Sequence, residues 1–523
     1  MNSPNSTSQQ PNLLIQNTTI HTPEFTLPPS TSLLIQKGKI SAIYHSKPPS
    51  KIRKHTQPLQ APKGCLIPGF IDCHLHLAAY ARSLKEVHIP PQSSKAKILS
   101  LVQQKTKKLP PNQWIFGRGW NKNHWPDPNF PTAQELDQVA PHHPVAIASR
   151  DAHCLWLNTL ALQTLHITSQ TPDPPGGKIL RNHKNQPTGI LLENAIQLLP
   201  PQTSLSPSEL NSTLEHLHSL GITGVHTIED GHTFSLLQQL QNKNKLHARV
   251  RFSLPASCLN SLQNCGMQSP FGNEQIRFCG IKLFADGTLG SQSAYMLEPY
   301  DNSNQQGMEI LQLNELLPTI TQAAKSHIQV LVHCIGDGAV QNTIQAFQKA
   351  LSLHPTPTLQ HRLEHCQHLP PKLLPHIAQL NLIASMQPCH LINDAPTIQK
   401  LLSKRQKYAY PFASLLNTGA HLAFGSDAPI ESPHPLRGLQ AAIERDNFLE
   451  GQENLTPRQA LIAYTSQAAT SFGEHDVGKI QLGCRADLVL FEEDILHLPP
   501  QELPKLHPLT VIVDGKILHP LKT

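Results

Sequence analysis

The sequence lacks several features that would place the protein in a special class. No run of about 18 apolar residues occurs, so no transmembrane helix is expected. The N-terminal stretch 1–16 has no cationic region followed by an apolar stretch, and we therefore expect no signal peptide. No block of five or six like charges is present, and the net charge of +6 is small for 523 residues. These absences argue against membrane insertion and against nucleic-acid binding, which requires a clustered basic face.

A disulfide framework is also missing. The ten cysteines are scattered, and no C-x-x-C motif occurs. Cys73, Cys334 and Cys366 each lie beside a histidine in an apolar segment. We interpret them as buried, reduced thiols of a cytoplasmic protein. Thiolate ligation of a metal is an alternative, but no cysteine spacing supports it.

The sequence contains eight apolar, strand-like segments that end in polar residues capable of chemistry. Helical patterns precede most of them, as at 206–221, 316–327 and 410–420, and a further helix is expected at 455–473. Strand–helix alternation with nearly continuous apolar strands indicates a parallel sheet, and eight such units indicate a (β/α)₈ barrel. The eight segments are 66–77, 221–230, 248–256, 276–287, 328–338, 361–367, 382–388 and 421–429.

Two parts of the chain do not follow this alternation. The two terminal regions contain short strands and turns, and together they predict one small composite β-sandwich domain, 1–66 with 475–523. The barrel then covers 67–474. About 140 residues separate its first two strands, far more than an ordinary connection. Residues 85–205 are therefore predicted to be an insertion, which we expect to act as a lid over the site and to bind substrate.

The first strand segment ends in His74-x-His76, a spacing that needs support from its setting. With 31 histidines in the chain, roughly two such pairs are expected by chance. On a strand, residues i and i+2 point to the same side, so both imidazoles can reach one ion. His216-x-His218 has the same spacing but lies in a helical pattern, where the two side chains point about 200° apart. We expect only the first pair to bind a metal.

Later strand segments supply partners for this pair. His333, His365 and Asp427 lie at the ends of the fifth, sixth and eighth segments. In a (β/α)₈ barrel the active site lies at the C-terminal ends of the strands, so these side chains should converge. Imidazole and carboxylate ligands suit zinc, and also manganese, iron or nickel. We therefore predict a divalent metal site.

Lys282, in the fourth segment, has two interpretations that residue type alone leaves open. An ammonium group repels metal ions, so a structural ion pair with Asp286 or another carboxylate is one. The other is that carbon dioxide converts the amine to a carbamate, an anion that can bridge two metal ions.

Longer motifs give a specific resemblance. They include "GFIDCHLHL", "KLFADGTLGSQSAYMLEPY", "HCIGDGAV", "RLEHCQ", "ASMQP" and "GSDAPIESPHPLRGLQAAI". In this order, over roughly residues 12–520, the chain resembles the metal-dependent amidohydrolase superfamily. It is most similar to the YtcJ-like branch (the amidohydrolase 3 family), which includes N-substituted formamide deformylases. The resemblance implies the same barrel with a composite β-sandwich.

The resemblance also implies the site. Zinc or a related divalent ion, one ion or two, would be held by a set of barrel residues, with Lys282 in carboxylated form where two ions bind. His153 and Trp120 of the insertion are implied as substrate-binding residues, although Ala152 stands where relatives often have Gly; core packing is the alternative for Trp120. A homodimer is also expected. The implied ligands are His74, His76, Lys282, His333, His365 and Asp427.

The function predicted from this site is hydrolysis of a non-peptide carbon–nitrogen bond in a small amide, formamide or cyclic amide. The metal activates a water molecule and polarises the carbonyl, while Asp427 carries the proton from the water to the leaving nitrogen. His333 or His365 could stabilise the oxyanion if not fully committed as a ligand. An esterase or lactonase with the same site is one alternative. A non-catalytic metal-dependent binding protein is another, but such a protein should have lost a ligand, and none is missing.

Overall fold

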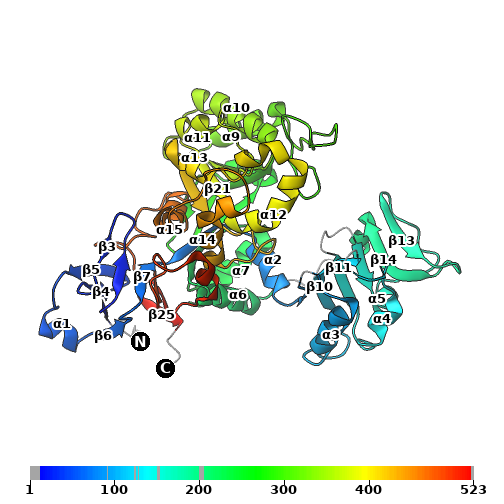
Figure 1. The fold of residues 1–523 in the computed structure, drawn as a ribbon, viewed down its shortest axis with the longest axis horizontal. Coiled ribbons are helices and arrows are strands. Elements are labelled where there is room, and N and C mark those ends of the chain that lie inside the picture. Colours follow the sequence, from blue (N-terminus) through cyan, green and yellow to red (C-terminus); the bar gives the residue numbers. More distant parts are fainter. Residues whose placement is uncertain are drawn as a thin grey trace. The chain divides into compact units, whose positions relative to one another are not determined.

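The protein is described by a computed structural model that covers residues 12–90, 92–122, 125–127, 129–149, 154–199 and 205–519. The chain divides into two compact units (Figure 1). Unit 1 consists of Met1–Ala78 together with Ser206–Thr523, and unit 2 consists of Ala79–Leu205.

Unit 1 contains the predicted barrel. Its eight strands follow one another as parallel neighbours in the order of the sequence. The last strand meets the first through backbone hydrogen bonds: the N–H groups of Ser426 and Asp427 donate to the carbonyl of His74 at 3.2 and 2.6 Å. The (β/α)₈ prediction is confirmed. The strands are β8 (Phe70–Leu75), β15 (Ile222–Ile228), β16 (Arg249–Pro255), β18 (Ile276–Phe284), β19 (Gln329–Cys334), β20 (Arg362–His365), β21 (Ile383–Met386) and β22 (His421–Phe424), with the short β17 (Phe271–Gly272) beside β18.

Helices connect the barrel strands as the apolar periodicity predicts. The helix before β15 begins with a capping box, in which Ser206 and Glu209 bond each other's backbone N–H groups and Pro207 occupies the first turn. The helices of unit 1 are α1 (Ser50–Lys54), α2 (Leu77–Ser83, continuing into unit 2), α6 (Pro207–Ser219), α7 (Gly231–Asn242), α8 (Leu259–Asn264), α9 (Leu313–Lys325), α10 (Asp337–Leu353), α11 (Leu374–Gln379), α12 (Pro388–Leu401), α13 (Phe412–Asn417), α14 (Pro435–Ile443), α15 (Pro457–Ala463) and α16 (Ser466–Thr470).

One helix that was predicted to be continuous is divided in the structure. The segment 455–473 forms two helices, α15 and α16, rather than one. The chain leaves helical geometry at Thr465, whose φ is −127° and ψ −94°. The break frees the carbonyl of Tyr464 to accept a hydrogen bond of 2.8 Å from the N–H of Ile71 in β8. The helix is therefore interrupted where it fastens to the first barrel strand.

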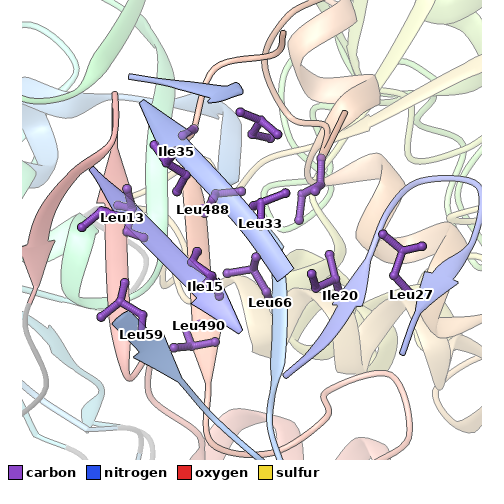
Figure 2. Packing of buried hydrophobic residues seen from close by; sticks show 14 of the residues in the cluster. Leu13, Ile15, Ile20, Leu27, Leu33, Ile35, Leu59, Leu66, Leu488 and Leu490 are labelled. Carbon is purple, nitrogen blue, oxygen red and sulfur yellow. The ribbon is translucent and has the colours of Figure 1, made fainter. Parts of the chain in front are cut away.

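Both termini build the composite β-sandwich beside the barrel, as predicted. Its two sheets share one apolar core, in which Leu13 and Ile15 pack with Leu488 and Leu490 from the far end of the chain (Figure 2). The first sheet has the order β5 (Lys39–Tyr44), β4 (Ser32–Gln36), β1 (Leu13–Gln16), β6 (Gln57–Gln60); the second has β25 (Lys516–His519), β24 (Thr510–Val513), β23 (Leu488–Phe491), β7 (Cys65–Pro68), β2 (Thr19–His21), β3 (Thr26–Leu27).

A buried ion-pair cluster joins the barrel to the sandwich. Arg249 of β16 donates from Nη2 to Asp487 Oδ1 at 3.0 Å and also bonds Asp514. Arg249 and Asp487 are both buried. Removing Arg249 leaves the buried carboxylate of Asp487 without its arginine partner, which is strongly destabilising.

We therefore expect Arg249→Ala to lower the free energy of unfolding by about 3–5 kcal/mol, measured by urea denaturation. The control is Lys505→Ala, which breaks an exposed pair with Glu502 and should change it by less than about 0.5 kcal/mol. Equal effects of the two substitutions would argue against a linking role for Arg249.

Unit 2 is built around a six-stranded mixed sheet with its own core. Strand Ile115–Trp120 pairs in parallel with strand Val145–Ser149. Strand Cys154–Leu157 pairs antiparallel with Val145–Ser149 and with Pro187–Glu193. Trp120 and Trp156 lie in this core. The elements are β9 (Val87–His88), α3 (Lys95–Thr106), β10 (Ile115–Trp120), α4 (Ala133–Asp137), β11 (Val145–Ser149), β12 (Cys154–Leu157), α5 (Thr159–Thr164), β13 (Gly177–Arg181) and β14 (Pro187–Glu193).

Two predictions about the whole chain can be compared with this structure. All ten cysteines are free, and Cys73, Cys334 and Cys366 are buried as expected. Among the described residues, no helix combines the length and apolarity needed to cross a membrane.

Candidate metal centre

The predicted site residues of the barrel lie at the carboxyl ends of its strands. The pairing of neighbouring strands aligns these ends. Phe284 at the end of β18 pairs with His333 of β19, and Cys334 at the end of β19 pairs with His365 of β20. His365 and Asp427 have positive φ values of 75° and 58°, which are rare for residues with a side chain. Such backbone geometry costs about 1–3 kcal/mol per residue and concentrates at functional sites.

Three of the predicted ligands form a tight group. Donor atoms of His74, His365 and Asp427 all lie within 4.8 Å of one another, and all three residues are buried. Asp427 Oδ1 is 3.4 Å from His74 Nε2 and 3.2 Å from His76 Nε2. Ligands held about 2.1 Å from a tetrahedral zinc ion are about 3.4 Å apart. The spacing of these donor atoms therefore fits a divalent ion.

His333 lies next to this group without belonging to it. Its ring centre is 4.4 Å from that of His365. Its Nε2 is 3.1 Å from the carbonyl of Gly287, which can only accept, so Nε2 carries the proton and Nδ1 keeps the lone pair. One nitrogen of His333 thus remains for a metal.

Hydrogen bonds behind the ligands orient two of the histidines. His74 Nδ1 donates to Glu364 Oε2 at 2.5 Å, so that Nε2 faces Asp427. His365 Nδ1 donates to Gln387 Oε1 at 2.7 Å. Arg362 in turn holds Glu364 with two bonds, of 2.7 and 3.1 Å. Such partners fix the tautomer of a metal-binding histidine and raise its basicity.

The protonation states suit ligands of a cation. Burial, reinforced by the charge of Lys282, lowers the pKa of His333 to about 3, and burial also lowers the pKa of His365. Burial alone would raise the pKa of Asp427, but hydrogen bonds with His74 and His76 hold that pKa well below its ordinary value. His333 and His365 are therefore neutral imidazoles beside an ionised carboxylate.

Lys282 is only 3% exposed, and its ammonium nitrogen Nζ has no hydrogen-bond partner within the described part of the chain. Burial lowers the pKa of this amine. The alternative of an ion pair with Asp286 was wrong, because the Asp286 carboxylate is occupied by the backbone N–H groups of Ile335, Gly336 and Tyr295. The Nζ atom of Lys282 lies 5.0 Å from the centre of the Phe284 ring. A buried amine without a hydrogen-bond partner fits a residue that acts at the metal group.

The other predicted residues have contacts of their own or lie outside the described residues. Trp120 is 2% exposed in the core of unit 2, where its indole N–H donates to the carbonyl of Ile147 at 2.8 Å and its ring stacks with Trp125. These contacts are those of the core-packing alternative. His153 lies outside the described residues. His218, in α6, donates to the carbonyl of Ile222 at 2.9 Å, so its pair with His216 is structural, as expected.

The sequence interpretation missed the residues that support the ligands. Arg362 and Glu364 stand two apart in a buried strand, and two opposite charges on one buried face must be paired, which was an available signal. Gln387 and His390, in contrast, follow β21 at the start of α12, where no spacing marked them.

Glu364 gives a prediction for this support. We expect Glu364→Gln to lower the affinity for zinc about 10–100-fold, because the neutral amide holds His74 less firmly. Competition with a chromogenic chelator measures the affinity. Gln399→Glu, a change on the exposed side of α12, is the control and should leave it unchanged. If Glu364→Gln and the unmodified protein bind zinc with equal affinity, Glu364 does not support the metal site.

Comparison with known proteins agrees with this geometry. A sequence model of the amidohydrolase family matches residues 63–519. The chain is 30% identical to the protein LONG AFTER FAR-RED 3 of Arabidopsis thaliana, over 97% of this chain and 91% of that protein. It is 29% identical to the putative amidohydrolase YtcJ of Bacillus subtilis, over 87% of this chain and 89% of that protein.

Two further proteins extend the comparison. The chain is 25% identical to an N-substituted formamide deformylase of Arthrobacter pascens, over 97% of this chain and 98% of that protein. An uncharacterized metal-dependent hydrolase from Pyrococcus furiosus has a similar structure, with a TM-score of 0.76 and 25% identity over 93% of this chain and all of that one. With its complete set of candidate ligands at the barrel's carboxyl end, the chain belongs to the amidohydrolase family, in the YtcJ-like branch of the metal-dependent hydrolases.

Proposed function

We propose that the protein hydrolyses a non-peptide carbon–nitrogen bond in a small amide, formamide or cyclic amide. The observation that carries the proposal is the placement of Asp427. Its Oδ1 lies 3.4 and 3.2 Å from Nε2 of His74 and His76, while its Oδ2 lies 3.7 Å from Nε2 of His390. One carboxylate oxygen can therefore stay with the metal ligands while the other handles a proton.

The proposed cofactor is a divalent ion, zinc by the chemistry of its donors. When bound, it supplies a Lewis acid for the substrate carbonyl and a water molecule of lowered pKa. The residues proposed to hold it are His74, His76, His333, His365 and Asp427.

Asp427 is the proposed proton carrier. Its ionised Oδ2 accepts a proton from the attacking water as the bond between water oxygen and carbonyl carbon forms. The same proton then passes to the leaving nitrogen as the carbon–nitrogen bond breaks, since an amide nitrogen departs as a neutral amine. Atoms and charge balance, and Asp427 ends the cycle ionised.

Lys282 is proposed to be the residue that decides between one ion and two. Its amine nitrogen would add to the carbon of carbon dioxide and release a proton, giving a carbamate with two oxygens. The buried, unpartnered Nζ supports this proposal, because an ammonium in that place satisfies none of its three donors.

The substrate class is proposed from two observations. The relative from Arthrobacter pascens is described as an N-substituted formamide deformylase. In this chain, the ring of Phe284 is 46% exposed and lies 5.3 Å from that of His333. An exposed aromatic ring beside the candidate ligands favours a substrate with an apolar substituent. N-benzylformamide is therefore the first probe.

A matched panel tests the type of bond. The zinc-loaded protein is given N-benzylformamide, N-benzylacetamide and a cyclic imide, and for comparison benzyl formate and a lactone. We expect the highest kcat/KM with a member of the amide group. Hydrolysis confined to the ester and lactone would replace this proposal with the esterase or lactonase alternative, and binding without turnover would favour a binding protein.

Three other expectations stay predictions. They are the action of the insertion as a lid with His153 and Trp120 near the substrate, a homodimer, and a location in the cytoplasm.

A further inference from the structure

A fourth histidine approaches Asp427 from a part of the barrel that supplies none of the candidate ligands. His390 lies in the first turn of α12, three residues after Gln387, which holds His365. Its Nε2 is 3.7 Å from Asp427 Oδ2, and its ring centre is 6.1 Å from that of His365. His390 therefore approaches Oδ2 of Asp427, whereas His74 and His76 approach Oδ1.

His390 does not belong to the tight ligand group. That group consists of His74, His365 and Asp427 among the described residues. The distance of 3.7 Å to Asp427 Oδ2 is also too long for a hydrogen bond. The residue is thus placed beside the proposed reacting atoms without being bonded to them.

The Nε2 of His390 is buried and has no hydrogen-bond partner among the described residues. Burying a polar atom without a hydrogen-bond partner lowers the stability of the fold by about 1–3 kcal/mol. Such an atom is therefore expected to form a hydrogen bond with a ligand or a water molecule. The carboxylate of Asp427 faces this nitrogen, and a negative charge favours a proton there over a lone pair. Nε2 is therefore an N–H donor directed into the site.

Three other histidines of the site, His74, His333 and His365, have no donor to spare. His74 and His365 each use Nδ1 to donate to Glu364 and Gln387, and His333 uses Nε2 to donate to Gly287. Each has one nitrogen left, and a nitrogen that binds a metal cannot donate. The expectation that His333 or His365 stabilises the oxyanion therefore conflicts with their role as ligands.

We propose that His390 is a catalytic residue that donates a hydrogen bond from Nε2 to the substrate's carbonyl oxygen, which becomes the oxyanion when water adds to the carbon. The inference rests on the proposed function, since it assigns a role in that reaction. No bond to His390 forms or breaks. A donor directed at the developing charge stabilises the transition state more than the substrate, because the charge is greatest there.

Three variants test this role with N-benzylformamide as the substrate probe. His390→Ala should lower kcat about 10²–10³-fold, the usual effect of losing one oxyanion donor. KM should stay within about threefold, and zinc content should not change. His390→Gln places an amide N–H near the position of Nε2, and its kcat should be at least about tenfold higher than that of His390→Ala. His434→Gln is the control, at a half-buried histidine at the start of α14 whose neighbours are His507 and Arg437.

A second measurement does not depend on turnover. Benzyl methylphosphonate carries a tetrahedral, anionic centre, and its affinity for the zinc-loaded protein is measured by calorimetry. His390→Ala should weaken it at least about tenfold, while the control variant should not. If kcat and phosphonate affinity both stay near those of the unmodified protein, His390 is not the donor. If His390→Ala loses zinc, the residue is a ligand, and the inference is wrong.

The two measurements also separate this inference from the proposed function. If the unmodified protein cleaves no amide but His390→Ala still loses phosphonate affinity, the proposed function is wrong and the donor stands. If amides are cleaved and the substitution changes neither quantity, the function stands and the donor is wrong.

Discussion

Asp427→Asn should lower kcat about 10²–10⁴-fold, the range for loss of a general acid–base residue. Asparagine has nearly the same shape, and its carbonyl oxygen can still face His74 and His76. The backbone bond from the N–H of Asp427 to His74, which helps to close the barrel, does not involve the side chain. The fold and most of the bound metal should therefore remain, while the proton carrier is lost.

Hydrolysis of N-benzylformamide, zinc content and thermal unfolding together test this expectation. Asp301→Asn is the matched control, because the Asp301 carboxylate accepts a hydrogen bond of 2.7 Å from the N–H of Ser403 at the surface. That variant should hydrolyse at the rate of the unmodified protein. If Asp427→Asn does so as well, Asp427 does not carry the proton.

His74→Ala should also have a large effect, which falls on the affinity for zinc. The substitution removes a ligand that two other groups hold in place, Glu364 at Nδ1 and Asp427 at Nε2. Loss of a supporting residue behind a ligand lowers metal affinity about 10–100-fold, so loss of the ligand itself should exceed about 100-fold. Zinc retained after gel filtration, measured by mass spectrometry, reports the effect.

The matched control comes from the second His-x-His pair. His216 has the same sequence spacing as His74 but lies on the exposed side of α6. His216→Ala should therefore leave zinc content unchanged. If both alanine variants keep zinc equally well, the ion is held elsewhere, and the strand geometry of His74 and His76 has no bearing on it.

The barrel could be predicted because its signals are local. The strands have four to nine residues, most of them are apolar runs, and polar side chains lie at or shortly after their ends. This pattern does not depend on distant partners. The direction of the candidate ligands follows from the same geometry. His74 and His76 share a side because they stand two apart on or beside β8, whereas His216 and His218 do not because α6 is a helix.

The errors arose where distant parts of the chain decide local structure. The helix over 455–473 breaks because the Tyr464 carbonyl serves Ile71, almost four hundred positions earlier in the sequence. Asp286 lies four residues from Lys282, but three backbone N–H groups take up its carboxylate. Neither contact can be inferred from the spacing of residues along the sequence.

The supporting residues of the site were hidden for the same reason. Glu364 meets His74 from a strand almost three hundred residues away, and Gln387 meets His365 only because β20 and β21 are neighbours. His390 begins a helix, where a single histidine has no periodic partner that could mark it. Only the assembled barrel brings its Nε2 to Asp427.

The most direct test of the account is the release of benzylamine from N-benzylformamide by the zinc-loaded protein, followed by chromatography before and after chelation. We expect benzylamine to form, its release to stop when the metal is removed, and the release to return when zinc is restored. Release that continues at the same rate without metal, or no amine from any amide in the panel, would contradict it.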